Sequence, residues 1–365
     1  MKLTLESGEV FVGTPIGRPL TGSEIVIAEL VFCTGQSGYE EVLTDPSYFR
    51  QIVLMTFPLI GNTGINTEDA EHSRPFLSGL VVRELEAEPS HYRCRQSLPD
   101  YLREQGIPGL SGIDTRAVTR YLRTHGTLKA ALSARDASPA AVSAALAAAL
   151  PGDHVAQVST RHPQHYAGAG PHVAVIDYGC KRGILRSLLS RRCAVTVFPH
   201  DASAAQVLAA QPAGVVLSNG PGDPRDLPAA LPVIRQLQEQ VPMLGICLGH
   251  QLFALANHAA TEKLHHGHRG CNRAVFERDS GRSAIAAHNH GYAVTEPSIA
   301  GTELTVTYRD LNDGCVEGLR HRRLPAFSVQ FHPEAGPGPE DPGFLFDEFL
   351  AALPAGRPNV EEPCR

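Results

Sequence analysis

The sequence contains no dense run of lysine or arginine, and its acidic residues outnumber its basic ones. It has 38 Asp and Glu against 32 Lys and Arg, which gives a formal net charge of −6. Proteins that bind nucleic acid neutralise phosphates with gathered basic side chains, and this composition offers no broad basic surface. We therefore expect no nucleic-acid partner.

Long apolar stretches are also missing. No segment approaches the length of a membrane span, and the opening residues MKLTLESGEVFVG alternate apolar with polar and include an early acid. A secretory signal needs a continuous apolar core, which this opening lacks. We expect a globular protein that neither crosses a membrane nor is secreted.

The eight cysteines form no CxxC pair and no compact framework like those of small disulfide-rich proteins. Cysteines scattered in this way are typical of reduced thiols. We therefore expect the chain to be cytoplasmic.

Length and local composition predict how the chain is divided. A chain of 365 residues exceeds what one core usually serves, so we expect two domains. An alanine-rich helical stretch, Ala134–Leu150, stops at Pro-Gly, and STRHPQHYAGAGP then follows without apolar periodicity. These signals predict an N-terminal domain at 1–150, a linker at 151–171, a second domain at 172–354 and a mobile C-terminal tail at 355–365.

The two domains differ in their predicted folds. The first mixes strand patterns (EIVIAELVF, QIVLMTF) with a helical one (DTRAVTRYLRTHG), which indicates mixed α/β structure. In the second, short apolar runs such as HVAVIDYG, AVTVFP, AGVVLSNG and VPMLGICLG alternate with helical stretches. Strands alternating with helices of this length predict a largely parallel sheet flanked by helices.

The segment GICLG places Cys247 between a buried strand pattern and a helix. This is the pattern of a nucleophile elbow, in which small residues two places on either side permit a sharp strand-to-helix turn. A thiol there lies beside the N-terminus of the helix, whose free N–H groups and dipole favour the thiolate. The alternative is a tight junction that merely buries a cysteine, and this segment alone favours neither.

Two further segments favour the catalytic interpretation. FHPE follows an apolar run near the end of the sheet pattern, and His332 with Glu334 offers a base and the acid that orients it. SNGPGDP also ends a strand pattern, and its glycines at 220 and 222 let backbone N–H groups approach an oxyanion. Ligands of open parallel sheets bind at the carboxyl ends of the strands, where all three segments fall.

Together these motifs resemble the class I, triad-type glutamine amidotransferases. Three other segments resemble one family within that class, the small subunits of carbamoyl phosphate synthetase: VFCTGQSGYEEVLTDPSYFRQIV, GIDTRAVTRYLRTHG and IDYGCKRGILR. The resemblance runs from about residue 2 to 353. It implies a mixed α/β N-terminal domain followed by a class I glutamine amidotransferase domain.

The resemblance also assigns residues. Cys247 would be the nucleophile, with His332 and Glu334 completing the triad. Contacts with L-glutamine are implied for eight residues: Ser47, Gly220, Gly222, Leu248, Gln251, Asn289, Gly291 and Tyr292. Without the family, Ser47 would simply be a turn serine after Asp-Pro. With it, the N-terminal domain contributes to the glutamine site and docks a partner.

Several positions depart from the family pattern. They are Cys33, His265, His266, Arg273, Ala274, Ala287 and His288. None is a proposed triad residue, so they bear on the shape of the glutamine pocket or on the partner surface. His265, His266 and His268 also suggest zinc ligands, but adjacent side chains of a strand point to opposite faces and no carboxylate or thiol has a familiar ligand spacing. We expect no metal site.

The implied function is glutamine hydrolysis that supplies ammonia to a large synthetase subunit, which makes carbamoyl phosphate from bicarbonate and ATP for arginine and pyrimidine synthesis. The chain has no Walker-type phosphate loop, so ATP and Mg²⁺ are expected in that large subunit, and no cofactor in this chain. The partners would be L-glutamine and the large subunit, in a hetero-oligomer. Two alternatives are a glutaminase serving an anthranilate or GMP synthase and a non-catalytic regulatory paralogue; the N-terminal segments and the intact triad count against them.

Overall fold

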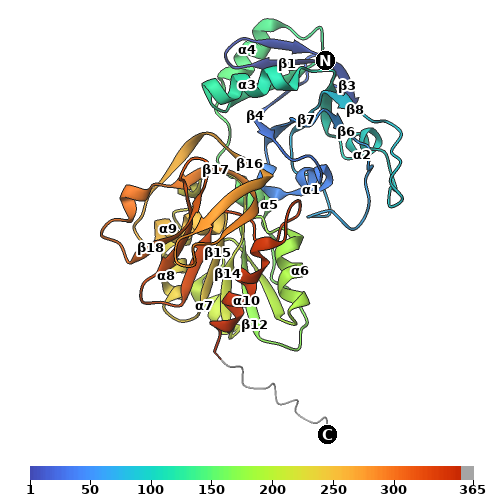
Figure 1. Cartoon of the computed structure of the whole chain (residues 1–365). Coiled ribbons are helices and arrows are strands. Elements are labelled where there is room, and N and C mark those ends of the chain that lie inside the picture. Colours follow the sequence, from blue (N-terminus) through green and yellow to red (C-terminus); the bar gives the residue numbers. More distant parts are fainter. Residues whose placement is uncertain (355–365) are drawn as a thin grey trace.

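The computed structural model describes residues 1–354; the predicted tail at 355–365 lies outside the described residues. Two sheets organise the chain, one in each half of the sequence, and Figure 1 shows the N-terminal half stacked on the larger C-terminal half. Among the described residues, no helix has both the length and the apolar character needed to cross a bilayer. The seven cysteines of this part are all free thiols.

The first sheet has eight strands of mixed direction, which confirms the predicted α/β character. In spatial order they are β2 (Val10–Val12), β1 (Lys2–Leu5), β10 (Leu128–Ser133), β4 (Ile25–Cys33), β5 (Gln51–Met55), β7 (Gly79–Val81), β9 (Pro108–Ser111) and β3 (Thr14–Gly17). β4, β5, β7 and β9 run parallel and the others antiparallel. A separate pair, β6 (Leu59–Ile60) and β8 (Glu84–Leu85), lies beside it.

Helices cover both faces of this sheet because their apolar residues recur at helical spacing. Val118 and Leu122 of α3 (Thr115–His125) pack on one face, and residues of α1 (Tyr39–Thr44) and α2 (Leu98–Glu104) pack on the other. α4 (Pro139–Ala147) packs on β10. The predicted helix at 134–150 is therefore shorter at both ends, since Pro139 starts it and the preceding residues continue from β10.

The second sheet has ten strands, and its centre is parallel as predicted. The order is β11 (Gln164–Tyr166), β13 (Ala194–Pro199), β12 (His172–Asp177), β14 (Gly214–Leu217), β15 (Met243–Ile246), β20 (Ala326–Val329), β19 (Val316–His321), β17 (Ser283–Val294), β16 (Thr261–Glu277) and β18 (Leu304–Asp310). β13 through β20 in this order run parallel. β16 to β19 add an antiparallel extension that the sequence pattern did not reveal.

Helices of the second half also form two layers. α7 (Ala204–Ala209), α8 (Ala230–Gln238) and α9 (Leu248–Ala256) share one core, and α6 (Arg182–Ser190) and α10 (Phe344–Ala351) share the other. The expected linker at 151–171 contains α5 (His154–Val158) and β11, which pairs with β13. It thus belongs to the edge of the second sheet.

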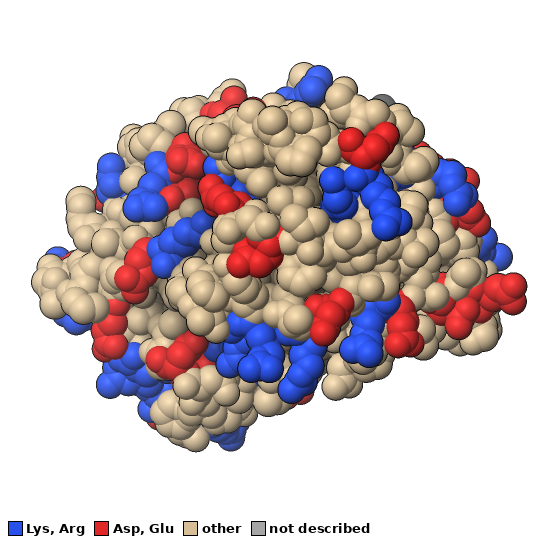
Figure 2. Space-filling model, turned by 90° about the horizontal axis from the view of Figure 1, so that it is seen from above, with Lys and Arg blue, Asp and Glu red and all other residues tan. Residues whose placement is uncertain are grey.

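The long strand β16 joins the two halves, as Figure 1 shows. Thr34 and Thr127 of the first half donate backbone hydrogen bonds to Arg269 and His265 of β16, at 3.1 and 2.9 Å. Seen from above in Figure 2, basic and acidic side chains are interspersed over the visible face. Neither sign of charge gathers there.

Candidate active site

Three loops meet where neighbouring parallel strands end. β14 leads into Ser218–Gly222, β15 into Cys247, and β20 into His332, and β15 pairs with both other strands. Parallel neighbours end at the same edge, so the sheet brings together three segments that are far apart in the sequence. The predicted position of all three motifs at carboxyl ends of strands is confirmed.

Cys247 has the strained backbone of a nucleophile elbow. Its φ is +55°, which residues other than glycine rarely adopt, and α9 starts at the next residue. The flanking glycines are needed for close packing: a Cβ at Gly249 would lie 2.2 Å from the Leu217 carbonyl, and one at Gly245 would lie 2.8 Å from the Gly249 carbonyl. The turn thus fixes where the thiol points.

His332 is held by Glu334 and lies near the nucleophile, although its Nε2 makes no hydrogen bond to a described residue. Its Nδ1 is 2.6 Å from Glu334 Oε1, and Cys247 is among the groups that raise the pKa of its ring. The Cys247 Sγ also lies 3.6 Å from the carbonyl oxygen of Asn289. The geometry therefore brings together the three residues predicted as a triad.

Lys181 completes this arrangement, and sequence reasoning gave it no role. Its Nζ lies 3.0 Å from Glu334 Oε1 and donates a 2.7 Å hydrogen bond to the carbonyl of Ala335, while only 2% of its side chain is exposed. The lysine stands in the segment IDYGCKRGILR directly after β12. The one indication in the sequence that Lys181 could reach the site was its position directly after a strand that neighbours β14.

Charges within this buried group shift its pKa values in opposite directions. Burial disfavours the imidazolium of His332, but the carboxylate of Glu334 outweighs burial and raises the pKa of His332 to about 10. Burial likewise disfavours the Glu334 carboxylate, but Lys181 and His332 lower its pKa to about 2. At neutral pH the group therefore holds an imidazolium, a carboxylate and an ammonium.

A cavity of about 360 Å³ opens onto Cys247. Seven of the eight predicted glutamine contacts line it: Ser47, Gly220, Gly222, Gln251, Asn289, Gly291 and Tyr292. Leu248 does not line it; it is the first residue of α9, directly after the nucleophile. Charged side chains of both signs complete the wall, among them Glu29, Lys263 and Arg269.

The N-terminal half contributes more to the site than Ser47. The hydroxyl of Ser47 accepts a 2.9 Å hydrogen bond from Asn219, and its backbone N–H donates to Asp45. Asp45 in turn accepts a 2.8 Å hydrogen bond from Asn289. Ser47 is thus a turn serine and a site residue at once.

Glu71 is a second carboxylate that the N-terminal half places in the other domain. Its Oε2 accepts a 2.8 Å hydrogen bond from the N–H of Gly183, and Arg186 lies 3.1 Å from its Oε1. Its charge also helps raise the pKa of the buried Lys181. The sequence assigned no role to Asp45 or Glu71, because Asn289 and Gly183, the residues of the second half that they bind, lie more than one hundred residues away.

The departures from the family pattern fall outside the cavity wall. His265 and His266 lie at the joint between the halves, where His265 Nε2 is 3.1 Å from the Thr124 carbonyl and His266 packs against Phe32. Arg273 and His288 belong to a separate buried network beside β17. These substitutions therefore change the surroundings of the site and leave its walls intact.

Two family models match the chain, and each covers one of the sheets. The model described as "Carbamoyl-phosphate synthase small chain, CPSase domain" matches residues 3–132. The model described as "Glutamine amidotransferase class-I" matches residues 174–352.

Relatives match over nearly the whole chain. The carbamoyl phosphate synthase small chain of Bacillus caldolyticus is 52% identical over 355 residues, covering 96% of each chain. That of Listeria monocytogenes serotype 4b is 50% identical over 352 residues, again covering 96% of each. The pyrimidine-specific small chain of Halalkalibacterium halodurans is 50% identical over 359 residues, covering 98% of each.

Proposed function

We propose that this chain, which belongs to the family of carbamoyl phosphate synthase small chains, hydrolyses L-glutamine and delivers the ammonia to a large synthase subunit. The observation that carries the proposal is the position of Cys247: it lies on a cavity wall and is close enough to His332 to raise the pKa of that ring, which is held by Glu334. A thiol, a base and an orienting carboxylate are the groups that covalent amide hydrolysis requires.

The chemistry begins at the sulfur. The thiolate of Cys247, whose proton has passed to His332, attacks the side-chain amide carbon of glutamine, and the carbonyl oxygen becomes an oxyanion. His332 gives a proton to the departing nitrogen, so ammonia leaves and a γ-glutamyl thioester remains on Cys247. His332 then takes a proton from water, which attacks the thioester and releases glutamate. The carboxylate of Glu334 keeps the imidazole oriented through both steps.

Backbone N–H groups would hold the oxyanion. Leu248 follows the nucleophile at the first turn of α9, where N–H groups have no partner within the helix. The Gly220–Gly222 loop is the second source of N–H groups. Gly220 packs closely on Tyr178: a Cβ added to Gly220 would lie 2.1 Å from the carbonyl oxygen of Tyr178. The close approach keeps this loop in place, so its N–H groups are oriented before the oxyanion forms.

The charges around the cavity suit the other end of glutamine. The α-amino and α-carboxylate groups carry opposite charges, and the wall offers the carboxylate of Glu29 and the guanidinium of Arg269. Pairing both charges compensates for the water that they lose on binding. The amide end is then left to point toward Cys247.

Ammonia has to reach its acceptor without protonation, since ammonium is a poor nucleophile. We propose that the chain forms a hetero-oligomer with the large subunit, which binds ATP and Mg²⁺ and uses bicarbonate and the delivered ammonia to make carbamoyl phosphate for arginine and pyrimidine synthesis. The hydrolysis itself uses side chains and backbone N–H groups of this chain and needs no cofactor. The free thiols of the described residues support a reducing compartment, the cytoplasm.

A direct test measures glutamate released from L-glutamine by the purified chain, alone and together with a large subunit. The proposal expects release in the complex, coupled to carbamoyl phosphate formation. If the complex makes carbamoyl phosphate from ammonium but releases no glutamate from glutamine, the chain is a regulatory paralogue and the proposal is wrong.

A further inference from the structure

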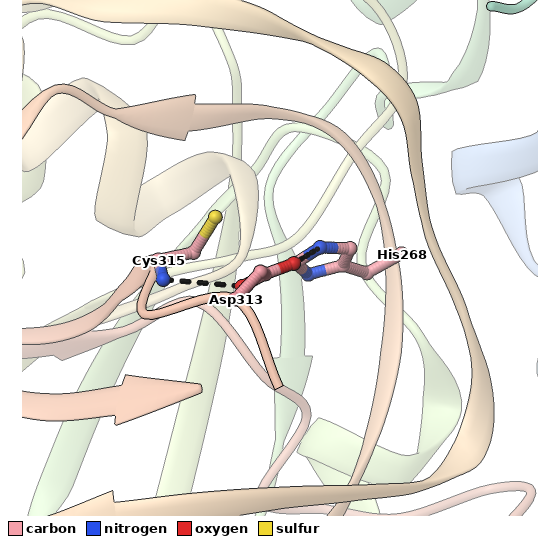
Figure 3. Close-up of side chains that lie close together, drawn as sticks. All are labelled: His268, Asp313 and Cys315. Atoms are coloured by element: carbon pink, nitrogen blue, oxygen red, sulfur yellow. Dashed lines mark hydrogen bonds and ion pairs between the residues drawn. The ribbon is translucent and has the colours of Figure 1, made fainter. Parts of the chain in front are cut away.

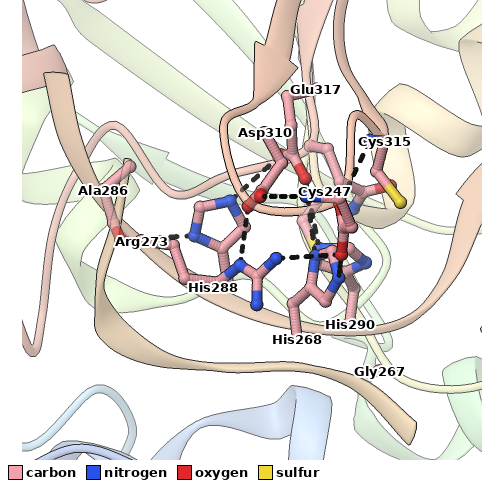
Figure 4. A network of polar contacts seen from close by, with 12 residues as sticks. Cys247, Gly267, His268, Arg273, Ala286, His288, His290, Asp310, Cys315 and Glu317 are labelled. Atoms are coloured by element: carbon pink, nitrogen blue, oxygen red, sulfur yellow. Dashed lines mark hydrogen bonds and ion pairs between the residues drawn. The ribbon is translucent and has the colours of Figure 1, made fainter. Parts of the chain in front are cut away.

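A second group of buried polar side chains lies beside the glutamine cavity, and one of its members, His290, belongs to the cavity wall. Figure 4 shows the rings of His268, His288 and His290 gathered around the carboxylate of Glu317, between strands β16, β17 and β19. All four are buried: the exposed fraction is 3% for His268 and His288, 5% for His290 and 0% for Glu317. The proposed glutamine hydrolysis uses none of them.

Three atoms in this group have no hydrogen-bond partner among the described residues. They are His268 Nδ1, His290 Nε2 and Glu317 Oε1. They lie within 4.8 Å of one another, with His268 Nδ1 at 3.6 Å and His290 Nε2 at 3.8 Å from the glutamate oxygen. A buried polar atom without a partner costs free energy, so three that face one another require an explanation.

The other nitrogen of each ring, His290 Nδ1 and His268 Nε2, faces a hydrogen-bond acceptor. His290 Nδ1 lies 2.8 Å from the carbonyl oxygen of Tyr292, and His268 Nε2 lies 2.7 Å from Asp313. Both partners can only accept, so both of these nitrogens carry hydrogen. In their neutral forms the two rings point lone pairs at the carboxylate, so that three electron-rich atoms converge on one point.

A shared cation fits this geometry better than a shared proton. A hydrogen bond would bring nitrogen and oxygen to about 2.7–3.2 Å, well inside the 3.6 and 3.8 Å found here. Nitrogen and oxygen ligands of a tetrahedral zinc ion lie about 3.3 Å apart, because each bond is about 2.0–2.1 Å. The ring N–H groups held by a carbonyl and a carboxylate are also the usual supports of metal-bound histidines.

Two neighbouring groupings of possible ligands do not fit. Figure 3 shows His268 with Asp313 and Cys315, but the 2.7 Å contact between His268 Nε2 and Asp313 is a hydrogen bond and too short for two ligands of one ion. Burial also raises the pKa of Cys315 to about 12, which keeps it a thiol. In the group of His288, Asp310 and Glu317, Asp310 already accepts a 2.7 Å hydrogen bond from Arg273, and His288 Nε2 is bonded to Glu317 Oε2.

We propose that His268 Nδ1, His290 Nε2 and Glu317 Oε1 bind a divalent transition-metal ion, with zinc as the best-fitting ion. Two imidazoles and one carboxylate suit zinc, cobalt and nickel, and leave a fourth position for water. Arg273 and His288, two of the departures singled out in the sequence, support the site by holding Asp310, Asp313 and Glu317 in place.

The ion would hold the strand that presents Asn289 and Gly291 to the cavity, since His290 stands between them on β17. Its role would be positioning, without a part in bond making or breaking. This consequence rests on the proposed function, whereas the metal site itself does not. Loss of the ion should raise the KM for glutamine about tenfold or more and change kcat much less.

The test measures metal content of the full-length, tag-free chain after chelator treatment, incubation with ZnSO₄ and gel filtration. We expect about one zinc per chain for the wild type, less than about one tenth for Glu317→Gln, and an unchanged content for His265→Gln, which alters a histidine of β16 outside the group. Circular dichroism verifies that each variant is folded.

Cobalt distinguishes this site from adventitious binding to thiols. CoCl₂ should give the visible absorption of a tetrahedral site with nitrogen and oxygen ligands, without the intense sulfur charge-transfer bands, and Cys315→Ser should leave the spectrum unchanged. A wild-type chain with less than about one tenth of an equivalent of zinc and no cobalt spectrum overturns the proposal whatever the variants do. A Glu317→Gln chain that keeps the full metal content overturns the ligand assignment.

Discussion

Lys181 Nζ lies 3.0 Å from Glu334 Oε1, the same oxygen that accepts the hydrogen bond of His332. One carboxylate oxygen is thus shared by the base of the proposed reaction and by a buried ammonium. Because Lys181 keeps Glu334 ionised, the imidazole always has an acceptor for its Nδ1 hydrogen. The triad predicted from sequence is therefore a group of four side chains.

Replacing Cys247 by serine should abolish glutamine-dependent synthesis, with a fall of at least about 10³-fold, because only the thiolate forms the thioester. The complex should still make carbamoyl phosphate from added ammonium. Both rates are measured on the same preparation. Glutamine-dependent turnover near the wild-type level would sink the nucleophile assignment.

The base His332 and the orienting carboxylate of Glu334 should differ in how much their replacement lowers turnover. His332→Ala should lower glutaminase turnover by about 10²–10⁴-fold, and Glu334→Gln should lower it by a smaller factor, since the imidazole remains. Single-turnover measurements of glutamate release compare the two variants side by side. If His332→Ala were the milder change, the assigned roles would be wrong.

Lys181 should matter for folding as well as for orientation. Lys181→Met leaves the buried carboxylate of Glu334 without its ammonium and should lower the free energy of unfolding by about 3–5 kcal/mol. Arg186→Met is the matched control: it also removes a cation from a buried carboxylate, that of Glu71, but its own side chain is 51% exposed. It should cost less than about 1 kcal/mol in urea unfolding. Equal losses would contradict the role given to Lys181.

Stability should decline on the alkaline side because of His332. Its pKa is raised from 6.5 to about 10, so this stabilisation is complete below pH 6.5 and is lost as the pH rises toward 10. Glu334, with a pKa lowered from 4.5 to about 2, adds a stabilisation that is complete above pH 4.5 and lost in acid. The free energy of unfolding of His332→Gln, measured from pH 5 to 10, should fall less steeply at high pH than that of the wild type. Parallel curves would contradict this prediction.

Removing the N-terminal half should abolish both catalysis and partner binding. A chain starting near Asp153 keeps α5 and β11 of the second sheet but lacks Asp45, Ser47 and Glu71. The side chains of Asn219 and Asn289 and the N–H of Gly183 therefore lose hydrogen-bond partners. Size-exclusion chromatography with light scattering compares its binding to the large subunit with that of the full chain. A truncated chain that folds and binds as tightly refutes the docking role of residues 1–150.

The local parts of this structure could be predicted from the sequence. GICLG, FHPE and SNGPGDP carry their turns in their own glycines and prolines, and parallel strands bring them to one edge. Helix limits were less accurate where alanine prevails, as in the stretch around α4, because alanine favours helix without marking its ends.

The remaining parts depend on contacts between distant segments. Glu71 reaches Gly183, and Glu317 reaches His268 and His290 from another strand, so no spacing along the chain reveals either relationship. The expectation of no metal site relied on neighbours in sequence, and the carboxylate proposed as a ligand arrives from β19. The assignment of Ser47 rested on the family resemblance for the same reason.

Asp45 and Ser47 contact residues of the second half, so these contacts can form only after the second half has been synthesised. The N-terminal half emerges from the ribosome first. At that stage Ser47 lacks its hydrogen-bond partner, because Asn219 has not yet been synthesised. Cys247 then emerges before His332 and Glu334, which follow β20, the last strand of the sheet to be synthesised. An incomplete chain that ends before His332 therefore carries the proposed nucleophile without its base, so the proposed hydrolysis requires a nearly complete chain.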